Sequence, residues 1–300
     1  LGLTKLDGYE FVKPLGGGSA LSSLYCDGNN VSVFKFLIAP RSDIERDRFI
    51  CEYLALKENR FVKGNSFQID PWESIFPKDS YPLPRVTHSL KCIDNSIFYF
   101  GYKYEEGELL SEYIKNRKFS LDEKITLLHR IASALNYFSH LNLEHRDLHP
   151  ENILVMSDPD MDSNKEHPSP KIKILDLGYS IDIYGFQHME FHNQVVEGIK
   201  LNLDAVTEDN NKRMLASFTS MPPDFLVKGK NTMNYDSWSF GIFAYSFLFD
   251  KQLFANASLE DIYKILNGHF HPLFHNEHAW PLATTNYPLY AILHSLLHTR

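Results

Sequence analysis

The hydrophobic periodicity of this chain changes once along its length, and that change limits the folds open to it. Over the first hundred residues or so, apolar side chains fall in short runs rich in β-branched and aromatic residues, as in 31–34 and 97–104, which is typical of strands. After a charged break at 105–108, apolar residues recur at helical spacing. A chain with its strands first and its helices after them is expected to have an α+β fold in two parts.

Three segments stand out within the strand-rich part. Residues 27–30 (Asp-Gly-Asn-Asn) predict a hairpin turn between two strands. Residues 42–57 place apolar side chains on one face at a period of 3.6, which predicts a helix. Residues 60–85 contain several prolines and are expected to form a long loop.

The helix-rich part also carries local signals. The capping-box pattern Ser-Leu-Asp-Glu at 120–123 predicts the start of a helix over 121–141. Two short strands are expected at 153–155 and 172–175. Residues 237–249 are apolar on nearly all sides, which predicts a helix buried in the core.

Length and composition narrow the classes of function. With 300 residues the chain can form one or two domains, and its 30 basic and 38 acidic residues give a net charge of −8. This acidic balance argues against sequence-independent nucleic-acid binding, which needs a basic face. The longest charge-free apolar stretch, 237–249, is shorter than the ~18 residues of a membrane span.

The cysteines and the first residue lead to two expectations about the context of the chain. Cys26, Cys51 and Cys92 contain no C-x-x-C pair, which fits a reduced protein of the cytoplasm or another intracellular compartment. The sequence does not begin with Met, so we expect it to be a domain excised from a longer chain.

The strongest chemical signal is the run His-Arg-Asp-Leu-His-Pro-Glu-Asn at 145–152, between a predicted helix and a predicted strand. Twenty-four residues after Asn152, Asp176-Leu177-Gly178 follows the next predicted strand. A hairpin would bring the two carboxylates and the amide together. ATP chemistry needs such a set, because one carboxylate can accept a hydroxyl proton while the other groups hold Mg²⁺ on the phosphates.

These residues resemble the motifs of the eukaryotic-type protein kinase family. The run at 145–152 is similar to the catalytic loop, and Asp-Leu-Gly is similar to the metal-binding Asp-Phe-Gly. The resemblance implies that Asp147 is the catalytic base and that Asn152 and Asp176 are Mg²⁺ ligands.

The resemblance extends through the first part of the chain. The segment 15–19 lies between two predicted strands, where the family has its phosphate-covering loop, and Lys35 ends a Val-Phe-Lys run similar to Val-Ala-Ile-Lys. Lys35 would contact the α/β-phosphates and pair with Glu52, with Glu45 and Glu58 as rival partners. The residues that the resemblance assigns to binding ATP are Gly16, Gly17, Gly18, Ser19, Val33, Lys35, Lys103, Tyr104 and Leu154.

Residues 102–105 resemble the hinge of the family. Its backbone, at Lys103 and Tyr104, would hydrogen-bond adenine, and the bulky Tyr102 would lie at the back of the pocket.

The second part of the chain carries two further motifs. Pro223-Asp224 is similar to the Pro-Glu that ends the activation segment, and residues 236–241 (Asp-Ser-Trp-Ser-Phe-Gly) are similar to the start of the central helix. In that helix Asp236 would support the backbone of the catalytic loop. Ser217 stands where Ser/Thr kinases have a Thr, which favours Ser/Thr specificity.

The chain departs from the family pattern at several positions. Leu21 replaces the third glycine of the phosphate loop, His149 replaces a lysine two residues after the catalytic Asp, and Leu177 replaces Phe. The segment from Asp176 to Asp224 is long. The pattern Asp-Leu-His-Pro at 147–150 is also common in small-molecule phosphotransferases, which keeps that class open.

Arg146 has two possible partners in this reading. It would hold either a phosphorylated activation segment, with phosphate expected between residues 179 and 221, or an acidic side chain.

We therefore expect an α+β, bilobal protein-kinase-like fold, with a small antiparallel-sheet N-lobe at 1–104 and a larger, mainly helical C-lobe at 105–300. The expected reaction is transfer of the γ-phosphoryl group of Mg-ATP to Ser/Thr hydroxyls of protein substrates, with ATP and Mg²⁺ as cofactors and without nucleic acid or a membrane span. The alternatives are a catalytically weak pseudokinase or scaffold and a small-molecule phosphotransferase of the kinase-like superfamily.

Overall fold

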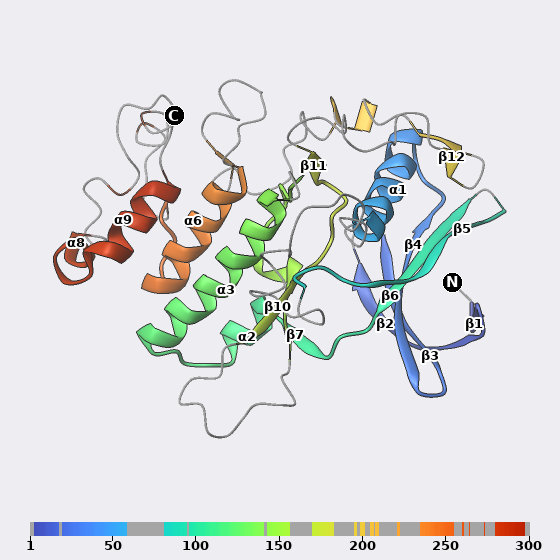
Figure 1. The fold of residues 1–300 in the computed structure, drawn as a ribbon, viewed down its shortest axis with the longest axis horizontal. Helices are drawn as coiled ribbons and strands as arrows, with labels where there is room; N and C mark the ends of the chain where they lie inside the picture. Colours follow the sequence, from blue (N-terminus) through green and yellow to red (C-terminus); the bar gives the residue numbers. More distant parts are fainter. Residues whose placement is uncertain are drawn as a thin grey trace, which may run out of the picture.

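A computed structural model shows how the chain is arranged, and Figure 1 draws it as two parts that lie side by side. One part is a sheet with one long helix, and the other contains the remaining helices. The structure describes residues 3–17, 20–58, 81–94, 96–140, 143–156, 170–182, 195–196, 199–201, 205–206, 208–209, 221–222, 235–254, 260, 264, 273 and 280–297.

The first part is built on a six-stranded antiparallel sheet with the strand order β1-β2-β3-β4-β6-β5. Its strands are β1 (Lys5–Leu6), β2 (Tyr9–Gly17), β3 (Leu21–Asp27), β4 (Asn30–Ile38), β5 (Val86–Ile93) and β6 (Ile97–Lys103). The predicted hairpin is confirmed, because Asp27 pairs with Asn30 at the end of β3 and β4. Gly28, with a φ of 55°, supplies the left-handed turn residue.

Strand β4 is buried on both faces, which explains its unbroken apolar run. Phe34 and Phe36 point to one face, where they join a small cluster with Tyr25 and Tyr99. Residues of the opposite alternation, such as Leu37, belong to the main core. Helix α1 (Asp43–Glu58) packs on that side through rings such as Phe49, whose centroid lies 5.1 Å from that of Phe100. The predicted helix over 42–57 is therefore confirmed.

Strand β5 was not predicted, because its sequence mixes apolar residues with Thr, His, Ser and Lys. The segment before it, 81–85, ties the two parts together through backbone hydrogen bonds. Ile174 donates its N–H to the carbonyl of Pro82 at 2.7 Å, and Lys103 donates to Arg85 at 2.8 Å. The predicted loop at 60–85 otherwise lies outside the described residues.

The second part contains a three-stranded sheet with the strand order β10-β9-β7. Its strands are β7 (Gly107–Leu109), β9 (Ile153–Met156) and β10 (Lys171–Ile174), which confirms the two strands predicted near 153 and 172. Two smaller antiparallel pairs join β8 (Leu143–Glu144) to β11 (Ile181–Asp182) and β12 (Val195–Val196) to β13 (Ile199–Lys200).

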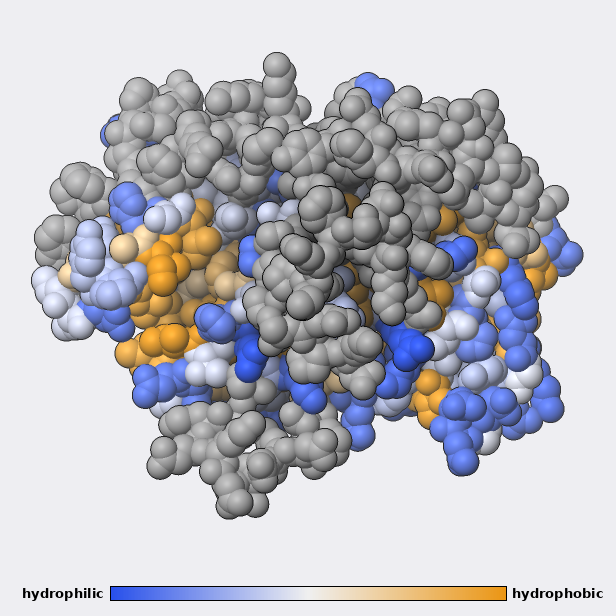
Figure 2. Space-filling view, in the orientation of Figure 1, coloured by the Kyte–Doolittle hydropathy of each residue, from blue (hydrophilic) through white to orange (hydrophobic). Residues whose placement is uncertain are grey.

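Helices α3, α6 and α9 of the second part lie side by side in Figure 1. The helices described in this part are α2 (Leu110–Lys115), α3 (Leu121–His140), α6 (Tyr235–Phe249), α8 (Trp280–Thr285) and α9 (Tyr287–Leu296), and α6 lies between α3 and α9. The capping box is confirmed, since Ser120 Oγ accepts the N–H of Glu123 and Glu123 accepts the N–H of Ser120 at 2.7 Å. On the face in Figure 2, apolar residues gather over these helices.

Helix α6 begins two residues earlier than predicted and is the buried helix that its apolar composition indicated. Eight of its residues are buried, among them Trp238 and Tyr245. No helix within the described ranges is both long enough and apolar enough to cross a membrane.

Candidate active site

The loop that carries Asp147 begins after β8 and ends in a 3-10 turn, η1 (Pro150–Asn152), which leads directly into β9. Proline starts this turn, as expected at a helix N-terminus. Ile153 pairs with Ile174 across the β9–β10 hairpin, and Leu175 donates its N–H to the carbonyl of Asn152 at 2.7 Å. The hairpin therefore holds Asn152 beside Leu175, the residue that precedes Asp176.

Asp236 of α6 holds the backbone of this loop by hydrogen bonds. Its carboxylate accepts the N–H of His145 at 2.6 Å and the N–H of Arg146 at 2.8 Å. Arg146 has a φ of 66°, a conformation that costs an L-residue roughly 1–2 kcal/mol. The predicted support of the loop by Asp236 is confirmed, and its charged hydrogen bonds offset this strain.

His145 links the loop to β10, a contact that the sequence did not reveal. Its ring is fully buried, Nδ1 accepts the N–H of Asp147 at 3.2 Å, and Nε2 lies 2.8 Å from the carbonyl oxygen of Leu175. Because Nδ1 accepts, Nε2 carries the proton and donates to Leu175. One ring thus fixes the backbone on both sides of the site.

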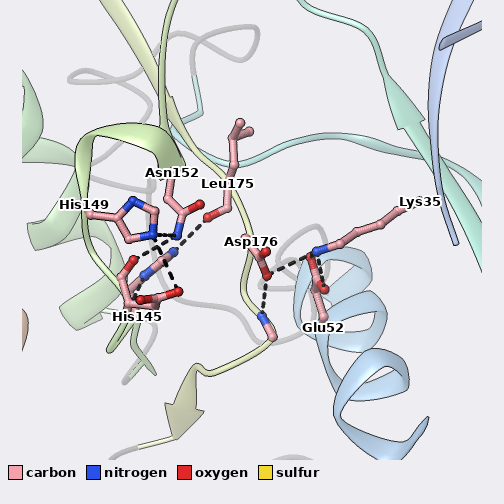
Figure 3. Close-up of polar contacts among 9 residues, drawn as sticks. Lys35, Glu52, His145, His149, Asn152, Leu175 and Asp176 are labelled. Atoms are coloured by element: carbon pink, nitrogen blue, oxygen red, sulfur yellow. Dashed lines mark hydrogen bonds and ion pairs between the residues drawn. The ribbon is translucent and has the colours of Figure 1, made fainter. Parts of the chain in front are cut away.

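Lys35 extends from the sheet to two carboxylates from different elements (Figure 3). Its ammonium group donates to both oxygens of Glu52 on α1, at 2.7 and 2.8 Å, and lies 3.1 Å from Asp176 Oδ1. The N–H of Leu177 also bonds the Glu52 carboxylate. The sheet, helix α1 and the end of β10 therefore meet at one ion cluster. The partner of Lys35 is Glu52 and not Glu45, which binds Arg41 instead.

Lys35 and Asp176 stabilise each other's charged forms, whereas burial and the charge of Asp176 raise the pKa of Glu52 to about 7, against the lowering effect of Lys35. Burial alone would disfavour the ammonium of Lys35, but Glu52 and Asp176 outweigh that cost and raise the pKa of Lys35. For Asp176, burial opposes ionisation, yet Lys35 and the N–H of Gly178 together lower the pKa of its carboxyl. Lys35 is a cation and Asp176 an anion at neutral pH.

Asn152 and Asp176 offer oxygen ligands that suit Mg²⁺. The Nδ2 of Asn152 is engaged by the carbonyl of Asp147 at 2.9 Å, and Asp176 Oδ1 is engaged by Lys35 and Gly178. Among the described residues, no hydrogen-bond donor reaches Asn152 Oδ1 or Asp176 Oδ2. A carboxylate and an amide oxygen fit the hard-oxygen preference of Mg²⁺.

His149 lies against both Asp147 and Asn152. Its Nε2 is 2.9 Å from Asn152 Nδ2 and 3.7 Å from Asp147 Oδ2. The two contacts need different states of the ring, since the amide requires a bare nitrogen and the carboxylate favours a protonated one. The hydrogen bond to the Asp147 carboxylate raises the pKa of the His149 ring, against the opposing effect of burial.

The predicted phosphate-covering loop is described at Gly16 and Gly17, whereas Gly18 and Ser19 lie outside the described residues. Gly17 has no room for a side chain, because an added Cβ would lie 2.1 Å from a backbone oxygen. Leu21 pairs with Phe36, so its side chain points away from the Lys35 face and is 42 % exposed. Its departure from glycine therefore does not place a side chain beside Lys35.

Val33 and Tyr102 share the face of the sheet that carries Lys35. Val33 lies two residues before Lys35 on β4 and pairs with Tyr102 on β6. Burial raises the pKa of Tyr102 to about 12, and its hydroxyl lies in hydrogen-bonding reach of Ser22. Tyr102 thus lies on the same face of the sheet as Lys35. Leu154, on β9 in the second part, is half-buried.

The predicted hinge uses its N–H groups inside the protein. Lys103 donates to Arg85, and Tyr104 donates to the carbonyl of Val31 at 3.2 Å. A contact of these two residues with adenine would therefore use carbonyl oxygens or side chains, and the next N–H along the chain is that of Glu105.

Arg48 of α1 makes a contact that sequence reasoning missed. Its guanidinium pairs with Asp209 and lies 5.0 Å from the centre of the Tyr179 ring. Arg48 is one helical turn before Glu52, so this ion pair holds α1 against the chain that follows Asp176. No local sequence signal relates residues this far apart.

The other expectations about the activation segment fall largely outside the described residues. Ser217, Pro223 and Asp224 lie there, so the phosphorylation expected between 179 and 221 stays a prediction. Arg146 is buried, with its guanidinium 4.8 Å from the centre of the Tyr235 ring. Burial lowers the pKa of this guanidinium, and the negative charge of Glu144 opposes that shift.

Comparison with known proteins adds independent findings. The family described as protein kinase domain matches residues 85–300. The calcium and calcium/calmodulin-dependent serine/threonine-protein kinase DMI-3 of Medicago truncatula is 32% identical over 165 residues, 55% of this chain and 26% of that protein. Serine/threonine-protein kinase ULK3 of Xenopus laevis is 26% identical over 178 residues, 59% of this chain and 31% of that protein. An Aurora kinase of Candida albicans is 25% identical over 266 residues, 87% of this chain and 45% of that protein. The chain thus spans less than half the length of each of these relatives.

Proposed function

The chain belongs to the protein kinase domain family, and we propose that it is an active kinase that transfers the γ-phosphoryl group of Mg-ATP to Ser or Thr hydroxyls of protein substrates. The relatives named above are serine/threonine-protein kinases or an Aurora kinase, which supports this substrate class.

One observation carries the proposal. The ammonium of Lys35 is bound by Glu52 and by Asp176 at once, at 2.7 and 3.1 Å, while Asn152 lies across the hairpin from Leu175. The ion cluster is thus assembled from three elements: a lysine of the sheet, a glutamate of α1 and an aspartate that follows β10. Phosphoryl transfer depends on such positioning of charge, because the protein has little covalent chemistry to perform.

We assign roles on this basis. Lys35, positioned by Glu52, would bind the α/β-phosphates, and Asn152 and Asp176 would hold Mg²⁺. When bound, the ion offsets the negative charge of the phosphates. Asp147 would orient the hydroxyl and accept its proton as the new oxygen–phosphorus bond forms, the bond to the β-phosphate oxygen breaks and ADP leaves.

The remaining assignments concern nucleotide contacts. The loop at Gly16, Gly17, Gly18 and Ser19 would cover the phosphates, and Val33 and Leu154 would enclose adenine from the two parts. We place the division between the lobes at residues 104 and 105, because β6 belongs to the six-stranded sheet while β7 pairs with β9.

A phosphoryl-transfer assay tests the proposal. Wild-type protein, Lys35→Met and Asp176→Asn are incubated with [γ-³²P]ATP, generic protein substrates and a panel of small hydroxyl compounds. Lys118→Met and Asp122→Asn make the same changes at exposed sites on the second part and serve as matched controls. Circular dichroism checks that each variant is folded.

We expect label on protein with wild type and both controls, and nearly none with Lys35→Met or Asp176→Asn. Activity retained in both of the latter would refute the site. Nucleotide binding without transfer by wild type would indicate a scaffold, and label only on small molecules would indicate a metabolite kinase.

A further inference from the structure

Lys173 is a charged residue on a buried strand, and none of the roles above uses it. It lies on β10, where the two parts of the molecule meet (Figure 1), and only 4 % of the residue is exposed. Its neighbours on the strand, Ile172 and Ile174, both belong to the main core. A lysine is seldom buried to this degree unless its ammonium group is paired, so its partners indicate what it does.

The partners of Lys173 come from the segments that enter and leave the β5–β6 hairpin. Its ammonium group donates to the carbonyl of Leu83 at 3.2 Å and lies 3.6 Å from the carboxylate of Glu105. Leu83 precedes β5, and Glu105 follows β6. One buried charge of the second part therefore holds the chain on both sides of this hairpin.

Glu105 has a second lysine nearby, but that contact does not fix its position relative to the second part. Lys103 Nζ lies 3.7 Å from the Glu105 carboxylate, yet it is two residues earlier on the same segment and its side chain is 53 % exposed. The side chain of Glu105 is only 14 % exposed. The pair with Lys173 is therefore the ionic contact that ties this segment to β10.

The contact lies next to the residues assigned to adenine. Lys173 pairs with Leu154 across β9 and β10, so their side chains share one face. The N–H groups of Lys103 and Tyr104 are used within the protein, whereas no acceptor among the described residues takes the N–H of Glu105. Glu105 thus offers the first backbone donor after β6 that a base could use.

We propose that Lys173 is a positioning residue for the nucleotide base: by pairing with the Glu105 carboxylate and donating to Leu83, it fixes the hinge with the N–H of Glu105 directed at an acceptor of adenine. The inference rests on the proposed function, since the nucleotide is the one that the site would bind. Lys173 itself acts on the base only through Glu105.

The substitutions at position 173 separate charge from packing. Methionine keeps a long apolar side chain but has no donor, so Glu105 would retain only Lys103, on its own segment. Arginine keeps the positive charge and has several donors, so it could still serve both Glu105 and Leu83. At position 105, glutamine keeps the shape of the side chain and removes its charge, while the backbone N–H remains.

The test compares two nucleotides that differ only in the base. ADP and inosine diphosphate (IDP) have the same ribose and phosphates, but the base of IDP carries a hydrogen on N1 and an oxygen in place of the amino group. Their dissociation constants are measured by isothermal titration calorimetry for wild type, Lys173→Met, Lys173→Arg and Glu105→Gln. Lys171→Met, at the exposed end of the same strand, is the matched control. Circular dichroism checks that each variant is folded.

We expect wild type to bind ADP at least tenfold more tightly than IDP, because a donor in the site meets an acceptor in one base and a hydrogen in the other. Lys173→Met should weaken ADP binding by about fivefold, the order of magnitude for one hydrogen bond, and change IDP binding less than twofold. Lys173→Arg and Lys171→Met should match wild type within about twofold. Glu105→Gln should lower the preference for ADP, and adding it to Lys173→Met should cause no further loss.

Several results would overturn the inference. If folded Lys173→Met keeps the preference of wild type for ADP, with both affinities unchanged or reduced equally, Lys173 does not position the hinge. If the losses from Lys173→Met and Glu105→Gln add, Lys173 does not act through Glu105. Should Lys173→Met not fold, Glu105→Gln decides, and an unchanged preference for ADP refutes the proposal.

The same data distinguish this inference from the proposed function. Wild type that binds ADP and IDP equally well would overturn the inference alone, because the hinge would not read the base. Wild type that prefers ADP but transfers no phosphoryl group would count against the proposed function alone, and the affinities of the variants would still decide the role of Lys173. Wild type that binds neither nucleotide would overturn both.

Discussion

Asp236→Asn tests how the active-site loop is held in its strained conformation. The carboxylate accepts two backbone N–H groups, at 2.6 and 2.8 Å, from residues that are almost fully buried. Asparagine keeps one acceptor oxygen but sets an NH₂ group against the second N–H. One charged hydrogen bond is therefore lost, and the other becomes a neutral one.

The cost can be estimated from these two bonds. A hydrogen bond to a charged group contributes about 1.5–3 kcal/mol, and a neutral one about 1 kcal/mol. Losing one charged bond and weakening the other gives a loss of about 3 kcal/mol. For 300 residues, an unfolding entropy of roughly 2 cal/mol/K per residue converts this to a fall in Tm of about 5 °C.

The assay combines stability and activity. Thermal and urea unfolding are followed by circular dichroism, and phosphoryl transfer is measured at 25 °C, where a domain with an ordinary stability of about 5–15 kcal/mol would still be folded after this loss. We expect transfer to fall at least tenfold, because Arg146, with its φ of 66°, is freed to relax next to Asp147.

Asp250→Asn is the matched control at the other end of α6. It breaks an ion pair with Lys124 whose aspartate is 82 % exposed, so its effect should stay within about 1 kcal/mol. If Asp236→Asn is as stable and as active as Asp250→Asn, the reasoning about the buried backbone donors is wrong.

Two further substitutions probe the packing around the site. Arg48→Met removes the ion pair with Asp209 and should favour displacement of α1 by about 1–2 kcal/mol, or roughly 5- to 30-fold; hydrogen exchange of α1 would rise accordingly, and unchanged exchange would contradict the role given to Arg48. Ser120→Ala removes the capping box of α3 and should lower the free energy of unfolding by about 1 kcal/mol; a urea midpoint equal to that of wild type would show that the cap with Glu123 is not needed.

Much of the fold could be predicted because its local signals are strong. The turn at Gly28, the capping box at Ser120 and the apolar run of α6 each have a local physical cause, and each occurs where the sequence indicates. Strand β5 could not be predicted in this way. Of its side chains only Val86 and Leu90 are buried, and the strand is held by pairing with β6 rather than by its own composition.

In the candidate site, too, local patterns could be predicted and long-range contacts could not. Lys35, Glu52 and Asp176 could be chosen by spacing, and the structure brings their side chains together. The contacts of His145 and Arg48 depend on residues 30 and 161 positions away, and such contacts leave no trace in a local pattern. They are set by how the sheet, α1 and the β9–β10 hairpin meet.

In the proposed mechanism, Asp147 takes part in phosphoryl transfer to a protein hydroxyl. The most direct measurement compares wild type with Asp147→Asn in a [γ-³²P]ATP reaction, followed by phosphoamino-acid analysis of the labelled protein and by a binding assay for the nucleotide. We expect phosphoserine or phosphothreonine from wild type, and unchanged nucleotide binding with almost no label from Asp147→Asn. Equal labelling by the two proteins, or nucleotide binding by wild type without any labelled hydroxyl, would contradict it.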